Sequence, residues 1–236
     1  NLEVCAEEKV GGIEVSGTPL DKVGTQYMDM LRKAGVKMFH KVGSVKHALH
    51  AEEAGYDGVY AAGIEEGGHP LNDDVTTMIL TPKMAETVKI PVVTVGGIAD
   101  GKSLAAALTL GAEGVMMATR FMATHECQVH ENIKKEILKR QENDTTLICK
   151  TVNLQGRAIK NKIVAEILEA EKKGANIMEL APLITGERCL KAWQTGDVDI
   201  APMMMGQSLG RINDIKSCKE VIEDMVAQAK KEIERV

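Results

Sequence analysis

Short apolar runs alternate with longer amphipathic stretches through the first half of the chain. A short apolar run between turn residues is typical of a buried strand, and apolar positions three and four residues apart are typical of a helix. The runs predict strands at residues 12–15, 37–42, 58–62, 91–95 and 114–117. The stretches between them predict helices at residues 22–34, 45–54, 76–88 and 102–110, after an opening helix at residues 2–8. This alternation indicates an α/β protein with a parallel sheet.

The spacing of these elements is typical of a TIM (β/α)8 barrel. Glycine follows three of the predicted helices, at Gly35, Gly55 and Gly111, where a left-handed residue commonly ends a helix. Five strands cannot close an eight-stranded barrel, so the pattern predicts a barrel that lacks about three N-terminal strands. The first residue is Asn1 rather than Met. We therefore expect the native protein to carry those strands before this residue.

The pattern changes after Phe121. Residues 132–141, 160–173 and 217–236 have helical periodicity, and no strand is predicted between them. This tail is too long for one final barrel helix and is expected to form a C-terminal helical cap. The predicted organisation is the C-terminal part of the barrel at residues 1–122, a cap at residues 123–205, and a return segment with the final barrel helix at residues 206–236.

Composition argues against several kinds of partner. The chain has 236 residues, a net charge of −5 and an aromatic content of 3%, whereas nucleic-acid binding favours basic surfaces and stacking platforms. No apolar run approaches the ~20 residues of a membrane span, and no secretory signal is visible. The five scattered cysteines lack CxxC spacing and are expected to be reduced thiols in a cytoplasmic protein.

Two consecutive predicted strands end in turns of small residues. The fourth strand runs into Gly96-Gly97, and the fifth runs into Ala118-Thr119. Backbone N–H groups in such turns, backed by a helix N-terminus, form an anion site, and the loops after the last two strands of TIM barrels hold phosphate in this way. A single Gly-Gly turn is more often a connection without a ligand. Two adjacent turns favour a phosphate site.

The segment after the third predicted strand carries a candidate catalytic group. Gly67-Gly68 lets the backbone approach a flat ligand closely, and His69 follows at its edge. A neutral imidazole can take a proton from a carbon acid near neutral pH. A loop histidine bonded to a backbone carbonyl is the alternative, and the phosphate turns two strands away favour catalysis. Lys41, which ends the second strand, could place a cation near a flavin or phosphate, or reach solvent.

Other polar residues have simpler interpretations. His47 and His50 share one helix face at the spacing of a metal pair, but no third ligand is evident nearby, so a solvated face is preferred and no metal is predicted. Asp73-Asp74 is expected to cap the helix that begins at Thr76.

The methionine run at residues 203–205 has two interpretations. Its sulfur atoms could pack against a planar ring while Gln207 donates a hydrogen bond, or the run could be a core patch. Periodicity alone does not separate them.

Several ordered stretches resemble the nitronate monooxygenase (2-nitropropane dioxygenase-like) family of FMN-dependent TIM barrels. The strongest are the opening segment, HKVGSVKHALHAEEAGYDGV, GIEEGGHPLNDDVTTMILTP and MGQSLGRINDI. The family also includes a flavin-type NAD(P)H:quinone reductase and the flavin-type enoyl-acyl-carrier-protein reductase.

The resemblance implies FMN across the C-terminal mouth of the barrel. His69 matches the family histidine that acts as a base toward nitroalkanes, or as a polar contact to substrate in the reductases. The phosphate would lie at the two small-residue turns, and the flavin ring near Lys41 and Gln207. The implied cofactor-binding residues are Lys41, Gly68, Gly96, Gly97, Met117, Ala118, Thr119 and Gln207.

Three positions depart from the family pattern. Ala118 stands where glycine is usual, but its N–H remains for phosphate. Ala62 stands where relatives often have a carboxylate, and Leu71-Asn72 replaces the usual Gly-Glu after His-Pro, so the substrate loop is expected to differ. The family's first three strands, which contact the flavin ring, are absent from this sequence.

Three functions are compatible with these residues. The first is nitronate monooxygenase, which oxidises alkyl nitronates to carbonyl compounds and nitrite with O2. The second is an NAD(P)H-dependent flavin reductase of quinones or of an enoyl thioester, with NAD(P)H as the reductant. The third is an inactive flavoprotein fragment. Each implies a small-molecule ligand, and a homodimer is the assembly considered.

Overall fold

The computed structural model describes residues 1–235. The chain divides into two compact units. The first contains Asn1–Gly63, Asp73–Val95 and Ala107–Met116, and the second contains the remaining described residues.

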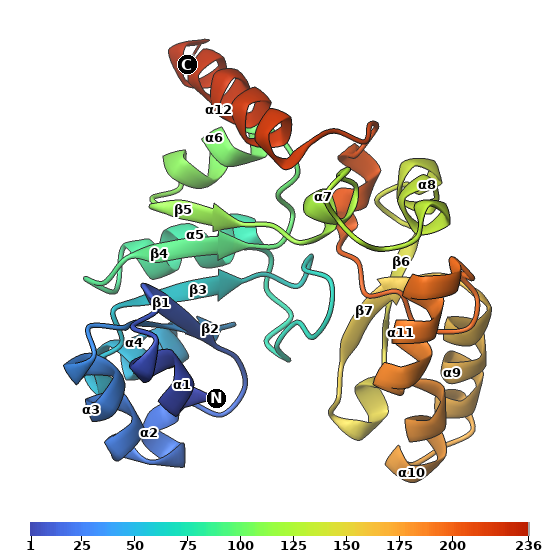
Figure 1. Ribbon diagram of the computed structural model, residues 1–236, viewed down its shortest axis with the longest axis horizontal. Coiled ribbons are helices and arrows are strands. Elements are labelled where there is room, and N and C mark those ends of the chain that lie inside the picture. The colour runs from blue at the N-terminus through green and yellow to red at the C-terminus, as the bar shows by residue number, and fades with distance from the viewer. Residues whose placement is uncertain (236) are drawn as a thin grey trace. The chain divides into compact units, whose positions relative to one another are not determined.

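The first unit contains a parallel sheet and its helices (Figure 1). The five strands pair in chain order, and every pair is parallel. The strands are β1 (Gly12–Val15), β2 (Lys37–Val42), β3 (Gly58–Ala62), β4 (Val92–Val95) and β5 (Gly114–Met116). The helices are α1 (Leu2–Glu7), α2 (Leu20–Val23), α3 (Thr25–Lys33), α4 (Val45–Ala54) and α5 (Thr77–Ala85), and α6 (Gly101–Thr109) spans both units. The predicted α/β class and TIM-barrel strand order are confirmed.

Apolar burial defines this first unit. Four of the five residues of β3 are buried, as expected for a central parallel strand covered on both faces. The core includes Leu31, Met38 and Met84, each 1% exposed or less. The predicted helix at residues 22–34 is instead two helices, because Gly24 adopts an extended conformation (φ 161°, ψ 125°) between α2 and α3.

The expected cap for α5 was wrong. The residue that precedes the helix is Thr76, so Asp73-Asp74 lies too early in the chain to cap it. Asp74 instead adopts a left-handed conformation (φ 52°) within the preceding loop, which Asp tolerates better than most residues.

The second unit is mainly helical but contains a hairpin of strands. Its helices are α7 (Thr119–Met122), α8 (Glu131–Lys139), α9 (Lys162–Lys172), α10 (Ile177–Leu180), α11 (Gly186–Thr195) and α12 (Cys218–Arg235). Single 3-10 turns are η1 (Lys150–Val152), η2 (Ala181–Leu183) and η3 (Gln207–Arg211). The antiparallel strands β6 (Thr145–Ile148) and β7 (Gly156–Ile159) lie between α8 and α9 (Figure 1).

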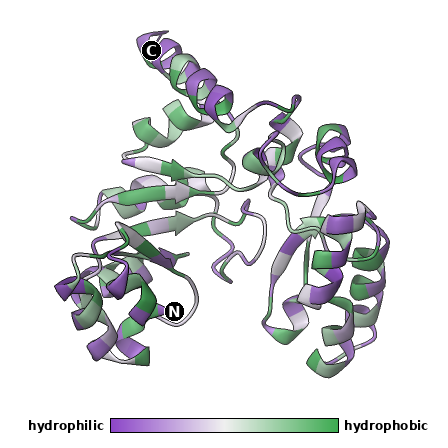
Figure 2. Ribbon diagram, in the orientation of Figure 1, coloured by the Kyte–Doolittle hydropathy of each residue, from purple (hydrophilic) through white to green (hydrophobic). Residues whose placement is uncertain are grey.

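The prediction of a tail without strands was therefore wrong. Each strand of the hairpin has four residues, and β7 contains glycine and arginine, so neither strand shows an apolar alternation. All four residues of β7 are nevertheless buried. Figure 2 shows the contrast, since β3 and β4 are largely green whereas hydrophilic purple interrupts β7.

The methionine run belongs to the core of the second unit. Met203 and Met205 are each 1% exposed and pack with Ile133, Ile137 and their neighbours. Met204 packs against a second cluster, which contains residues of β6, β7 and α9. The core interpretation of the run is therefore confirmed. Within residues 1–235, every helix is too short or too polar to cross a membrane.

Candidate functional site

The loop at residues 64–71, which follows β3 in the chain, carries His69; we call it the His69 loop. His69 is exposed, and its Nδ1 lies 3.0 Å from the backbone oxygen of Gln155. A carbonyl oxygen can only accept, so Nδ1 carries the proton and the basic nitrogen of the neutral ring is Nε2. The alternative to a catalytic role for His69 was a hydrogen bond to a backbone carbonyl, and this bond is present. It also fixes which ring nitrogen carries the proton in the neutral form.

Strand β7 and the residue before it hold the His69 loop. The N–H of Arg157 donates to Gly68 O (2.6 Å), and the N–H of Gly68 donates to Arg157 O (3.2 Å). The Arg157 side chain donates from Nε to Ile64 O (2.8 Å). The Gln155 side chain donates from Nε2 to Leu71 O (3.2 Å). Sequence reasoning missed both residues, because a buried glutamine and a buried arginine have no apolar signature.

The two glycines before His69 have different structural reasons. A Cβ on Gly67 would lie 2.5 Å from Gly206 N and from Met205 C, so the close approach of two backbone segments excludes a side chain. Gly68 has φ +88°, a conformation that favours glycine, and a Cβ there would meet nothing within 4 Å. The space beside Gly68 is therefore open, whereas the protein itself fills the space at Gly67.

Hydrogen bonds link the His69 loop to the segment with Gln207 and to the turn after β5. The N–H of Gln207 donates to Glu65 O (3.0 Å). The N–H of the preceding residue, Gly206, donates to the buried Oγ1 of Thr119 (3.1 Å). The structure therefore brings the predicted residues Gly68, His69, Thr119 and Gln207 into one hydrogen-bonded network.

The turn after β4 contains two glycines with positive φ angles. Gly96 (φ +99°) and Gly97 (φ +73°) are consecutive left-handed residues, and both are half-buried. Ala118 is exposed and immediately precedes α7, a single-turn helix. Phosphate sites of TIM barrels are often formed by the loops after the last two strands together with a short extra helix, and α7 is such a helix in sequence position.

Two backbone N–H groups in the first turn of helix α6 already donate to side chains of the protein. The N–H of Ser103 donates to Asp100 Oδ1 (2.9 Å), and the N–H of Gly101 donates to Gln228 Oε1 (2.8 Å). Of the two helices that follow the predicted phosphate turns, α7 is therefore the better match to the expected supporting helix.

The remaining predicted residues are more scattered. Met117 is half-buried between β5 and α7. Lys41 lies on β2 in the first unit, in register with Tyr60. His47 and His50 have separate partners, since His47 Nδ1 lies 2.9 Å from Ser44 Oγ and His50 contacts a carboxylate. Residues 1–235 contain no cluster of three or more potential metal ligands from His, Cys, Asp and Glu.

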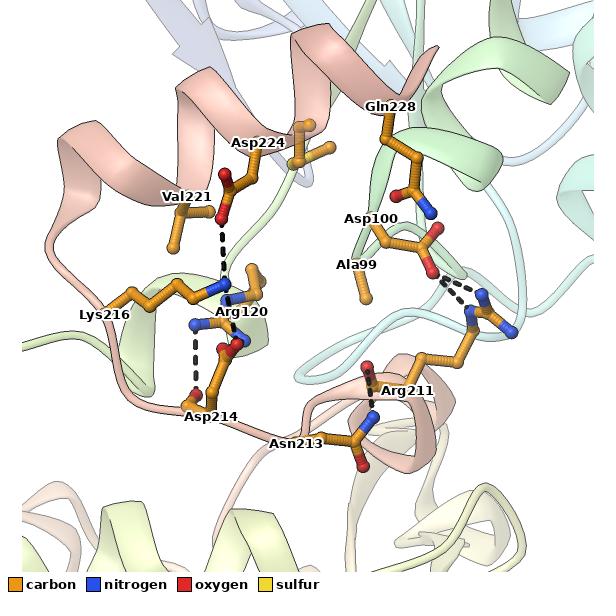
Figure 3. Close-up of a pocket in the computed structure, with 11 residues that line it drawn as sticks. Ala99, Asp100, Arg120, Arg211, Asn213, Asp214, Lys216, Val221, Asp224 and Gln228 are labelled. Carbon is orange, nitrogen blue, oxygen red and sulfur yellow. Dashed lines mark hydrogen bonds and ion pairs between the residues drawn. The ribbon is translucent and has the colours of Figure 1, made fainter. Parts of the chain in front are cut away.

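A polar cavity of about 150 Å³ lies within the second unit (Figure 3). Its charged residues are Asp100, Arg120, Arg211, Asp214, Lys216 and Asp224. Arg211 Nε donates to Asp100 Oδ2 at 2.8 Å. Burial alone would raise the pKa of Asp100, but hydrogen bonds from Ser103 and Arg211 hold that pKa below its usual range.

The other ions of the cavity form a chain. Lys216 Nζ lies 2.8 Å from Asp214 Oδ2 and 2.8 Å from Asp224 Oδ2, as Figure 3 shows. These hydrogen bonds raise the pKa of Lys216. Buried Arg120 pairs with Asp214 through Nη1 at 3.0 Å. This chain of ion pairs joins α7, the segment before α12 and α12 itself. With the Asp100–Arg211 pair included, the cavity has three cations and three carboxylates, so its charges balance.

The parallel β/α repeat and the small-residue turns after its last two strands are typical of the TIM-barrel fold. The chain belongs to the nitronate monooxygenase family, whose model matches residues 2–228.

Individual relatives differ in their names. A Rhodococcus jostii protein, named (3aS,4S,5R,7aS)-5-hydroxy-7a-methyl-1-oxo-octahydro-1H-indene-4-carboxyl-CoA dehydrogenase, is 32% identical over 86% of this chain and 67% of its own length. A Staphylococcus aureus protein, named probable nitronate monooxygenase, is 32% identical over 78% of this chain. The solved structure of FabK from Thermotoga maritima is 36% identical, with a TM-score of 0.91 over 99% of this chain and 72% of its own. The matched region spans 54% of the Staphylococcus protein, about half its length.

Proposed function

We propose that the protein is an FMN-dependent oxidoreductase with nitronate monooxygenase activity, in which His69 is the general base. The observation that carries this proposal is the 3.0 Å contact between His69 Nδ1 and Gln155 O, because it assigns the basic lone pair of the neutral ring to Nε2. Family membership supports the reaction class.

The residues of the second unit fit the phosphate and ring of a flavin. The backbone N–H groups of Gly96 and Gly97, both at positive φ, would bind the phosphate, and Met117, Ala118 and Thr119 would complete the phosphate site. The open space at Gly68 would let a flat ring approach the backbone. Gln207 is the further residue of this unit proposed to contact it. FMN, when bound, supplies the electron acceptor for substrate oxidation.

The protein's own residues would handle the proton. His69 Nε2 would remove the proton from the carbon next to the nitro group, and the electron pair of that C–H bond would remain on the substrate as a nitronate. Gln155 O would stabilise the imidazolium through its contact with Nδ1–H. A preformed nitronate has already lost this proton and would not need the base.

An anaerobic visible spectrum of the purified protein tests the reaction class. We expect an oxidised flavin band that ethylnitronate bleaches and that NADH or NADPH leaves unchanged. Rapid bleaching by a nicotinamide would contradict the monooxygenase proposal. Absence of any flavin band would favour the inactive fragment.

A second candidate is an NAD(P)H-dependent oxidoreductase that acts on an acyl thioester. The name of the Rhodococcus jostii relative supports it, because that protein is a dehydrogenase of a carboxyl-CoA compound. In this case His69 would orient or protonate the acceptor. Bleaching of the flavin by NAD(P)H, followed by reoxidation with an enoyl-CoA, would identify this activity.

A further inference from the structure

We infer that Arg157 is a positioning residue for His69, which rests on the proposed role of His69 as a base. Arg157 lies on β7 and is 7% exposed. It is far from His69 in the sequence. Its bonds nevertheless reach the His69 loop at two points, one at the start of the loop and one directly before the histidine.

The first point of contact uses the side chain. Nε donates to Ile64 O at 2.8 Å, and Nη1 donates to Thr145 Oγ1 of β6 at 3.0 Å. The guanidinium therefore joins the start of the His69 loop to the neighbouring strand. The planar fork of arginine can direct two donors at fixed angles, whereas the single ammonium of lysine cannot reproduce that geometry.

The second point of contact uses the backbone. Arg157 and Gly68 exchange two hydrogen bonds, at 2.6 Å and 3.2 Å, so that Gly68 forms an antiparallel bridge with β7. The acceptor of His69 Nδ1 is the backbone oxygen of Gln155, two residues before Arg157. The register between β7 and the His69 loop therefore sets whether Nδ1 meets its carbonyl.

Through these contacts, Arg157 would influence the tautomer and orientation of the His69 imidazole, and it would not contact the substrate. When the guanidinium is lost, the backbone pairing at Gly68 and the bond from the Gln207 N–H to Glu65 O remain, but Ile64 O loses its donor. The imidazole then has more freedom to leave Gln155 O, and Nδ1 loses the carbonyl that favours its protonation. A misplaced catalytic group commonly slows a reaction by about 10²-fold.

The test compares Arg157→Met and Arg157→Lys with the matched variant Arg188→Met. Arg188 lies in the same unit and also donates to a backbone carbonyl, from Nη1 to Ile200 O at 2.9 Å, but it does not contact the His69 loop. The first readout is the ¹⁵N spectrum of the histidine side chains, with His69→Gln identifying the signals of His69. We expect an Nδ1–H tautomer in the wild type, a mixture of tautomers in Arg157→Met, and no change in Arg188→Met.

The second readout separates the base step from the rest of turnover. In Arg157→Met, kcat on a neutral nitroalkane should fall by about 10- to 100-fold while kcat on preformed nitronate changes by less than about 2-fold. Arg157→Lys should not restore the wild-type rate. Unchanged His69 signals, or equal losses on both substrates, would overturn the inference.

A further variant covers the case in which Arg157→Met does not fold. Thr145→Val removes the acceptor of Nη1 while it keeps the arginine, and a smaller change in the tautomer of His69 and in nitroalkane turnover is expected. If His69→Gln leaves nitroalkane turnover unchanged, the proposed base role is wrong, yet the tautomer of His69 still decides whether Arg157 positions the ring.

Discussion

The parallel sheet of the first unit and the β6–β7 hairpin of the second are held by different forces. Around the sheet, large side chains such as Leu31 and Met84 are fully buried in one apolar cluster. In the hairpin, buried Gln155 and Arg157 make directed hydrogen bonds to the His69 loop. Apolar burial tolerates small shifts, whereas a hydrogen bond weakens steeply with misalignment. The polar hairpin is therefore suited to hold a proton-transfer group, and the apolar sheet is suited to provide stability.

The largest expected effect lies on the polar side of this comparison. His69→Ala should slow turnover of a neutral nitroalkane by about 10²–10⁴-fold, because it removes the positioned base. Turnover of preformed nitronate and binding of FMN should be nearly unchanged. Steady-state kinetics with both substrates and a flavin absorbance titration measure this. Equal loss on both substrates would contradict the role of His69 as a base.

The next effect belongs to the apolar side. Met84→Ala should lower the free energy of unfolding by about 2–5 kcal/mol, because it leaves a cavity in the core of the first unit. Met84 is 0% exposed, whereas Met78, on the same helix, is 64% exposed. Met78→Ala is therefore the matched control and should change stability by about 0.5 kcal/mol or less. Urea denaturation of the two variants measures the difference, and similar losses would show that burial at this helix does not determine stability.

The contrast between the apolar sheet and the polar hairpin also explains which elements could be predicted from the sequence. The five strands of the sheet were predicted to within one residue at each end, because each is a short run rich in apolar residues that lies between turn residues. The hairpin was missed, since Arg157 of β7 is bonded by Gly68 and Ile159 by Met203, both far away in sequence. No local sequence pattern predicts such a distant partner.

The candidate site follows the same division. His69 and the glycine turns stand directly after strands, so position in a β/α repeat was enough to propose them. The identity of the residues that hold His69 depends on the fold of the second unit. Gly67 shows the limit of the sequence prediction, because open space lies beside its neighbour Gly68 whereas Gly67 itself packs against the protein backbone.

A pair of substitutions separates these two glycines. Gly67→Ala should lower the free energy of unfolding by about 1–3 kcal/mol, because the new Cβ must displace a backbone segment. Gly68→Ala should cost about 1 kcal/mol, from its left-handed φ of +88° alone. We also expect Gly67→Ala to change the tautomer signals of His69, since it moves the loop away from Gln207. Denaturant unfolding and ¹⁵N spectra check both points, and a greater loss of stability in Gly68→Ala would contradict the assignment.

The smallest effect concerns the ion pairs of the second unit and appears only in the pH dependence of stability. Because the pKa of Asp100 is lower in the folded protein than in the unfolded chain, the unfolded chain binds the proton more readily. The contribution of Asp100 is therefore present at neutral pH and is lost as the pH falls through the usual aspartate range toward the folded pKa. Asp100→Asn keeps a residue that can cap α6 but removes the charge that pairs with Arg211.

Stability at pH 7 should fall by about 0.5 kcal/mol in Asp100→Asn, as for a partly exposed ion pair. The difference between wild type and variant should shrink when unfolding is measured at pH values below about 4, near the ordinary aspartate pKa. Arg211→Met is the matched variant and should give a smaller pH dependence, because the Ser103 donors to Asp100 remain. A difference that stays constant with pH would mean that Asp100 acts through its cap alone, and the charge pairing would then contribute nothing to the second unit.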